Sequence, residues 1–137
     1  MTIEKNELLL SHDGFSRATP VKRHVRRLRL RDHVLEVTDS FEGEGEVTVE
    51  LCWNFGGEYS VLDTESLVAK SKANEVKLAL LHPDTGQPVV HGRCMAVALR
   101  ESLSYGEVAP SLAMRLSLAL ALPTRIMTRF TISRCAA

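Results

Sequence analysis

Apolar and polar residues alternate along Val34–Phe55, VLEVTDSFEGEGEVTVELCWNF, in two runs separated by a glycine-containing segment. Side chains of a strand point alternately to its two faces, so each run predicts a strand with one buried and one solvated face. The connecting residues Glu42–Glu46 include two glycines, which tolerate the positive φ that a tight reversal needs. The pattern therefore predicts a β-hairpin over Val34–Phe55.

The residues before this hairpin predict two more strands. Leu8–Phe15 has the pattern of a short strand that runs into a turn at Asp13-Gly14, and an extended segment restarts at Thr19-Pro20. In Val25–Leu30, leucines alternate with arginines. We expect a three-stranded meander in which an arginine row lies beside glutamates and threonines, where opposite charges pair across strands. The row consists of Arg27, Arg29 and Arg31, and its expected neighbours are Glu36, Thr38, Thr48 and Glu50.

The pattern weakens over Tyr59–Lys72, where a loop or an edge strand is expected, and becomes regular again at Glu75–His82. There Val76, Leu78 and Leu80 share one face. Pro83–Gly86 has the composition of a turn. Val89–Leu99 is then the expected partner strand, so that a second hairpin forms.

Ser111–Leu122, SLAMRLSLALAL, is rich in residues that favour helices. Its large apolar residues nevertheless occupy every second position, and a helix would scatter them around its axis. We therefore predict a strand, bracketed by Pro110 and Pro123, with Ile126, Phe130 and Ile132 in a separate final strand.

Several such strands, with turn signals between them and no convincing helix, predict an all-β fold, a two-sheet antiparallel β-sandwich. The 137 residues suit a single domain, 1–137. No apolar run reaches the ~18 residues of a membrane span, and the N-terminus lacks the layout of a signal peptide.

Composition excludes several classes of protein. The 17 basic residues equal the 17 acidic ones in number, which argues against a general polyanion binder and against a nucleic-acid partner. The three cysteines, Cys52, Cys94 and Cys135, lack the spacing of a zinc ribbon or a disulfide scaffold, so free thiols are expected.

Three segments resemble, in succession, the C-terminal β-rich part of the heparinase II/III-like proteins. They are Ser11-His12-Asp13-Gly14-Phe15, His24 with Arg26-Arg27, and LEVTDSFEGEGEVTVEL. Ser104-Tyr105-Gly106, Pro110-Ser111 and Leu122-Pro123 with Thr128-Arg129 are similar to the closing strands of that family. Around His24 the order Lys-Arg-His-Val-Arg-Arg departs from the family's His-Arg pair.

The resemblance implies a polysaccharide lyase that acts on uronic-acid-containing polymers by β-elimination, with an N-terminal α/α toroid ahead of the β-sandwich. The family's catalytic residues, and the ligands of its frequent zinc, resemble motifs upstream of the Ser11–Phe15 segment. We therefore carry over no catalytic or metal residue and expect no cofactor in this chain. The chain resembles a fragment that begins just after the chemistry, from a family that is often periplasmic or secreted.

Each candidate side chain has a functional and a structural interpretation. The histidines His12, His24, His33, His82 and His91 lack a ligand spacing, which favours structural or surface roles over a metal site. Trp53 can stack on a sugar, but its alternation with Val49 and Leu51 favours the core. The row Arg27/Arg29/Arg31 can grip carboxylates or sulfates, or can pair with Glu36 and Glu50. Tyr105 is a candidate acid or base, but no histidine lies near it in the sequence, which argues against that role.

The sequence thus predicts a lyase module that is itself supportive or glycan-binding and not catalytic. Its expected partners are acidic polysaccharide or the missing toroid. The glycan-binding candidates are Arg27, Arg29, Arg31, His12 and His24. The alternatives are a free-standing module that binds acidic carbohydrate, and a structural or oligomerisation domain.

Overall fold

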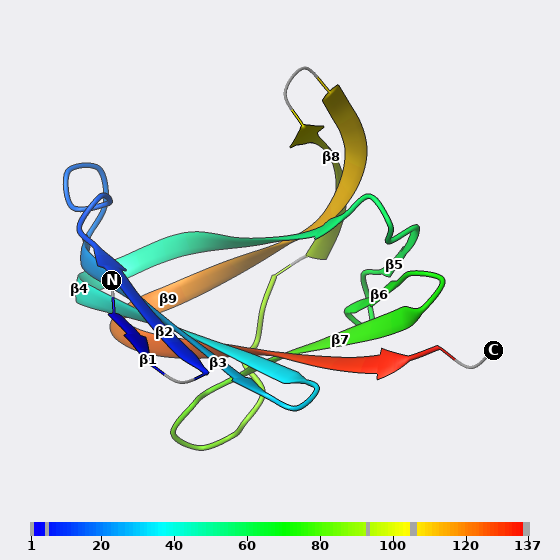
Figure 1. The fold of residues 1–137 in the computed structure, drawn as a ribbon. Coiled ribbons are helices and arrows are strands. Elements are labelled where there is room, and N and C mark those ends of the chain that lie inside the picture. Colours follow the sequence, from blue (N-terminus) through cyan, green and yellow to red (C-terminus); the bar gives the residue numbers. More distant parts are fainter. Residues whose placement is uncertain (1, 5, 93, 105–106, 136–137) are drawn as a thin grey trace.

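The computed structural model describes residues 2–4, 6–92, 94–104 and 107–135. In these ranges nine strands form one antiparallel sheet, in the order β1-β2-β3-β4-β9-β7-β6-β5, with β8 paired to β9 (Figure 1). The strands are β1 (Thr2–Glu4), β2 (Glu7–His12), β3 (Val21–Arg31), β4 (Val34–Gly56), β5 (Val61–Asp63), β6 (Val68–Lys70), β7 (Asn74–Leu81), β8 (Cys94–Ser104) and β9 (Glu107–Arg134). None of the described residues forms a helix long and apolar enough to cross a membrane.

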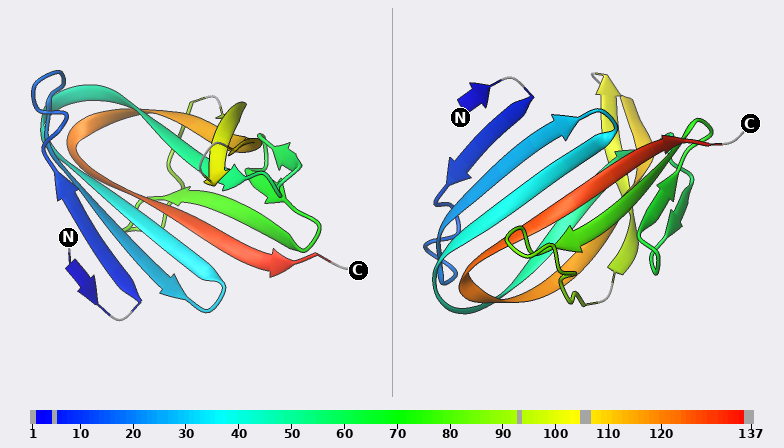
Figure 2. Two further views of the ribbon diagram at one scale, coloured as in Figure 1. Left: turned by 45° about the horizontal axis from the view of Figure 1, so that its top comes forward. Right: turned by 90° about the horizontal axis from the view of Figure 1, so that it is seen from below.

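The two long strands β4 and β9 pair with each other along almost their whole length and bend together (Figure 2). The bend folds the sheet over itself into two facing layers. One layer contains β1, β2, β3 and β7 with the first half of β4 and the second half of β9. The other contains the second half of β4, the first half of β9, and β8. The prediction of an all-β antiparallel sandwich is confirmed, and its two layers are continuous through β4 and β9.

The predicted hairpin over Val34–Phe55 is wrong, because this segment is a single strand. Glu42–Glu46 does not reverse the chain; the register to β9 shifts between Phe41 and Gly45, which is a bulge at the bend. Gly43 and Gly45 have φ of 146° and 98°. Glycines with positive φ serve a bulge as well as a turn, so the local sequence fits both. Thr48 and Glu50 consequently lie in the other layer and do not extend the arginine meander.

The predicted second hairpin is also wrong. The turn at Pro83–Gly86 forms, and the Gly86 N–H donates to the His82 carbonyl oxygen at 2.8 Å. A short pairing with β7 follows, through the bridge between Leu81 and Pro88 and the Val89 N–H, which donates to the Leu80 carbonyl oxygen at 2.9 Å. After Val89, however, the segment predicted as the partner strand leaves β7. The rest of β7 is already paired, with β9 along its length and with β6 at Glu75–Lys77. The chain therefore continues to β8, which pairs with the first half of β9.

Ser111–Leu122 is a strand, as its alternation predicts, and its inward residues form the centre of the core. Met114, Leu116 and Leu118 are at most 1% exposed. The predicted break at Pro123 is absent, since β9 continues to Arg134. Pro123 lies at the bend, between the paired positions Leu122 and Thr124, opposite the bulge of β4. A proline is tolerated at such a bulge because no ladder hydrogen bond is lost there.

Candidate functional site

A groove of about 380 Å³ opens between the two layers, near the bend. One wall comes from β2, β3 and the loop after β2, which contribute His12, Phe15, His24 and Arg26. The other wall comes from the second half of β4 and includes Glu50 and Cys52. The groove therefore combines an aromatic ring, two imidazoles and a guanidinium in one place.

The registers of β2, β3 and β4 explain why these side chains meet. His12 lies opposite His24, and His24 lies opposite Phe41. The next inward pair is Arg26 opposite Asp39. Directly opposed residues of neighbouring strands point to the same face of the sheet, with Cβ atoms about 5 Å apart. All of these side chains therefore face the space between the layers.

Asp39 is fully buried and holds the floor of the groove together. His24 Nε2 lies 2.7 Å from Asp39 Oδ1. Arg26 donates from Nε to Oδ1 at 2.7 Å and from Nη2 to Oδ2 at 3.1 Å. Burial by itself would raise the pKa of Asp39, but the hydrogen bonds from His24 and Arg26, together with the Arg26 charge, outweigh it and lower the pKa below its ordinary value. Asp39 is therefore an ionised, paired carboxylate.

Aromatic contacts hold the imidazoles and the guanidinium in place. His24 stacks on Phe41, with ring centroids 4.6 Å apart. His12 meets His24 and Phe15 edge-on, at 5.1 Å in each case. The Arg26 guanidinium carbon lies 4.9 Å from the centre of the Trp53 ring, a cation–π contact across the two layers.

Trp53 is partly buried and packs against the core. Its ring meets Phe130 edge-on at 5.0 Å. The reading of Trp53 as a core residue fits this position.

The predicted arginine row lies on the opposite face of the sheet from the groove. Arg27 pairs with Glu7 at 2.9 Å. Arg29 stands opposite Glu36 in the register, but the Glu36 carboxylate pairs with Arg129 of β9 at 3.3 Å. Arg29 and Arg31 are exposed, and neither is ion-paired within the described residues. The five glycan-binding candidates are thus divided: His12 and His24 line the groove, and the three arginines lie behind it.

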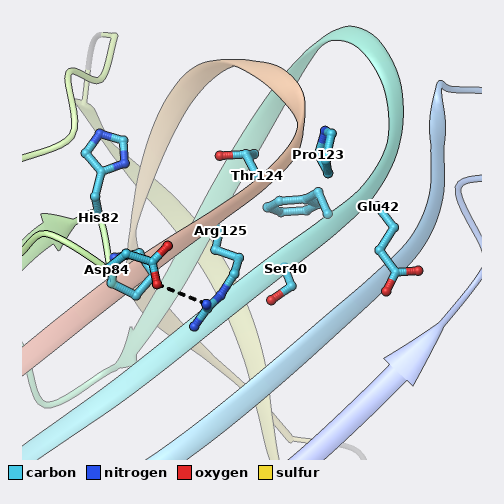
Figure 3. A pocket seen from close by; sticks show the side chains of 9 residues that line it. Ser40, Glu42, His82, Asp84, Pro123, Thr124 and Arg125 are labelled. Atoms are coloured by element: carbon cyan, nitrogen blue, oxygen red, sulfur yellow. Dashed lines mark hydrogen bonds and ion pairs between the residues drawn. The ribbon is translucent and has the colours of Figure 1, made fainter.

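A second hollow, of about 510 Å³, lies at the bend beside the β7 turn (Figure 3). Its side chains come from three segments, around Ser40, His82 and Thr124. Arg125 and Asp84 point toward each other there, 3.1 Å apart, and Glu42 points away from them. Both members of this pair are about half exposed or more, so water screens their attraction. The hollow is open and offers no buried polar group for a ligand.

A family model described as "Heparinase II/III-like, C-terminal" matches residues 2–111. The chain belongs to the heparinase II/III-like C-terminal family. A comparison with curated proteins finds no match.

Two solved structures resemble this heparinase II/III-like chain. One is titled as a heparinase III gene product with methylated lysines, with a TM-score of 0.63 and 15% identity. The match covers 96% of this chain and 20% of the chain of that structure. The other, a heparan sulfate lyase HepC mutant from Pedobacter heparinus, has a TM-score of 0.65 and 14% identity, over 99% of this chain and 21% of its own. At this identity the likeness shows the fold, and the chain spans about a fifth of each neighbour.

The zinc that the heparinase II/III-like resemblance implies does not fit the groove. In the described part of the chain, no three histidine, cysteine, aspartate or glutamate side chains lie close enough together to hold a metal ion. His24 and Asp39 are instead engaged with His12 and Arg26. Tyr105, the weighed acid or base, lies outside the described residues together with Gly106.

Sequence reasoning missed Phe15 and Arg26, which line the groove of this heparinase II/III-like chain, and Asp39, which pairs with Arg26 beneath it. A signal for two of them was present. Arg26 shares its parity with Leu28 and Leu30, and Asp39 shares its parity with Val37 and Phe41. A charge on the apolar face of a predicted strand needs a buried partner, and these two charges are each other's partner. Phe15 lies in a loop, where alternation gives no orientation.

Proposed function

We propose that the chain is the glycan-contacting C-terminal module of a polysaccharide lyase that acts on uronic-acid-containing polysaccharide. The observation that carries the proposal is membership of the heparinase II/III-like family over residues 2–111. A fold shared with a protein titled heparan sulfate lyase supports it. Because the chain spans about a fifth of that neighbour, the module is expected to act beside a larger catalytic part.

The groove has the chemistry to contact an acidic sugar. Phe15 is 45% exposed at its rim, which leaves a ring face for the apolar side of a pyranose. Arg26 is about one-third exposed, and its remaining N–H groups can donate to a carboxylate or a sulfate. Aromatic contact and charged donors from neighbouring elements are a common combination in ligand sites.

The module is proposed to support elimination and not to perform it alone. Elimination at a uronate needs a group that neutralises the carboxylate, a base for the C5 proton and an acid for the leaving oxygen. In the groove the two histidines bind each other, and His24 also binds Asp39. Absorbance of unsaturated uronate produced from heparin or alginate by this chain alone would contradict the proposal.

Binding is tested by titrating heparin, alginate and a neutral glucan against the chain at low and raised salt. The acidic polymers are expected to bind, more weakly as salt rises, and the neutral glucan is not. Phe15→Ala should weaken heparin binding by about fivefold, because a stacked ring contributes about 1 kcal/mol. Met95→Ala is the matched control, since Met95 is equally exposed, at 45%, on β8. Equal losses in both variants would contradict a role for the groove.

The second candidate, a free-standing module that binds acidic carbohydrate through the arginine row, is favoured by the exposure of Arg29 and Arg31. The variant Arg29→Glu separates the two proposals. If the groove binds the glycan, charge reversal on the far face should change heparin affinity by no more than about threefold at physiological salt, where distant charges are screened. Abolished binding would favour the arginine face. If no polymer binds and light scattering shows a concentration-dependent dimer, the chain is a structural or oligomerisation domain.

A further inference from the structure

The hydrogen bonds around His12 and His24 form one directed chain. The Gly14 N–H donates to His12 Nδ1 at 3.2 Å, so this nitrogen is the acceptor and Nε2 carries the proton. His12 Nε2 lies 3.1 Å from His24 Nδ1, which must then accept. The proton of His24 is therefore on Nε2, which donates to the ionised Asp39 at 2.7 Å. Both imidazoles are neutral, and each ring nitrogen has a partner.

An added proton changes the hydrogen bonds of this series at its solvent-exposed end, at His12. The added proton enters at His12 Nδ1, and the positive charge can then stay on His12. Alternatively, the proton already on His12 Nε2 moves to His24 Nδ1, which places the charge on His24, next to Asp39. In both cases His12 Nδ1 changes from an acceptor to a donor, and its bond from the Gly14 N–H is lost. His12 is exposed, whereas the His24 side chain is 12% exposed, so the new donor appears at the mouth of the groove.

The loop that carries Phe15 does not depend on the bond that is lost. The Ser16 N–H donates to the Asp13 carbonyl oxygen at 3.0 Å, and the Thr19 N–H and hydroxyl both donate to the Phe15 carbonyl oxygen, at 3.0 and 2.9 Å. Phe15 therefore stays at the rim when His12 is protonated.

The charges around the pair favour an anion only after protonation. On β3 and β4, Arg26 is neutralised by Asp39. On the opposite wall Glu50 forms an ion pair with Arg115 at 3.8 Å, and Cys52 contributes a thiol. In the loop, Asp13 and Arg17 are exposed. With both imidazoles neutral these charges balance one another, and one added proton gives the groove a net positive charge.

We propose that the His12–His24 pair takes up one proton and then binds one anionic group, the carboxylate or sulfate of an acidic sugar, at His12 Nδ1 beside Phe15 and Arg26. The sugar as the source of that group rests on the proposed function. Because only the protonated pair presents a donor at His12 Nδ1, capture of the anion should be stronger in mild acid.

Glucuronate, glucose and inorganic sulfate are the probes, titrated at pH 5.5 and pH 8 with NMR detection of the histidine ring nitrogens. At pH 8 the wild-type spectrum should show His12 protonated on Nε2 and unprotonated on Nδ1. Glucuronate should bind at least about fivefold more tightly at pH 5.5 than at pH 8, and glucose should not bind at either pH. An Nδ1-protonated His12 at pH 8, or equal glucuronate affinity at the two pH values, would overturn the proposal.

The variant His12→Gln keeps a polar side chain without a titrating group. It should bind glucuronate with affinities within about twofold at the two pH values, while the control His82→Gln should keep the wild-type ratio. Heparin distinguishes this proposal from the proposed function. If heparin binds both wild type and His12→Gln with the same pH ratio, the proton-coupled site is wrong and glycan binding stands. If heparin binds neither protein at either pH, the proposed function fails. If neither glucuronate nor inorganic sulfate binds the wild type at pH 5.5, the proposal is overturned.

Discussion

Asp39→Asn is expected to destabilise the protein by about 3 kcal/mol at pH 7, measured by urea unfolding. Removing one member of a buried ion pair costs about 3–5 kcal/mol, because the remaining charge loses its partner without regaining water. A loss near 3 kcal/mol, the lower end of this range, is expected because the Arg26 side chain is 32% exposed and can be partly hydrated. The control is Asp84→Asn, which removes an exposed pair with Arg125 and should cost at most about 1 kcal/mol. Equal effects of the two variants would contradict the role given to Asp39.

The effect of Asp39 should also depend on pH. Its pKa is lowered in the folded protein, so its stabilising contribution is fully present above the ordinary aspartate value of 3.8 and is lost as the pH falls through the folded value. The difference in stability between wild type and Asp39→Asn should therefore be largest near neutral pH and shrink below pH 3.8. A difference that grew in acid would mean that Asp39 is protonated in the folded state.

Gly43→Ala is expected to cost about 3 kcal/mol as well, for a steric reason. Gly43 has φ of 146°, a conformation that a side chain adopts with a strain of about 1–3 kcal/mol. A Cβ at this position would also collide with the backbone carbonyl oxygen of Pro20, and the backbone must move to relieve it. Thermal or urea unfolding of the purified variant measures the loss.

Gly45→Ala is the matched control for the bend. Gly45 also has a positive φ, of 98°, but an added Cβ would meet nothing within 4 Å. It should therefore cost only the backbone strain, about 1 kcal/mol. If Gly43→Ala were the milder of the two, the close approach of Pro20 to the bend would be wrong.

Alternation alone predicted the strands of this fold well, because most of them bury one face. Leu116 and Leu118 are buried on every second position of a segment whose composition favours a helix. The partners of the strands could not be predicted in the same way. Gly43 and Gly45 fit a turn and a bulge equally, and the choice is made by β9, which pairs with β4 on both sides of the bend. A strand about 80 residues later in the chain is invisible to local pattern.

The candidate site was predicted in part for a similar reason. His12 and His24 were named from the sequence, and the register brings their rings within hydrogen-bond distance. The arginine row was named for its charge, but strand parity places it on the face away from the groove. Arg26 has the opposite parity and reaches the groove because Asp39 compensates its burial. The alternation of side chains along the strand therefore predicted which arginine reaches the groove better than the charge of the residues did.

The groove as the glycan-contacting surface is tested most directly by following the backbone amide NMR signals of the full chain during titration with a heparin tetrasaccharide. The account predicts that shifts concentrate in residues 12–16, 24–26 and 50–52, and that they are stronger at pH 5.5 than at pH 8. Shifts confined to Arg29 and Arg31 and their neighbours, or no shifts at a saturating concentration, would contradict it.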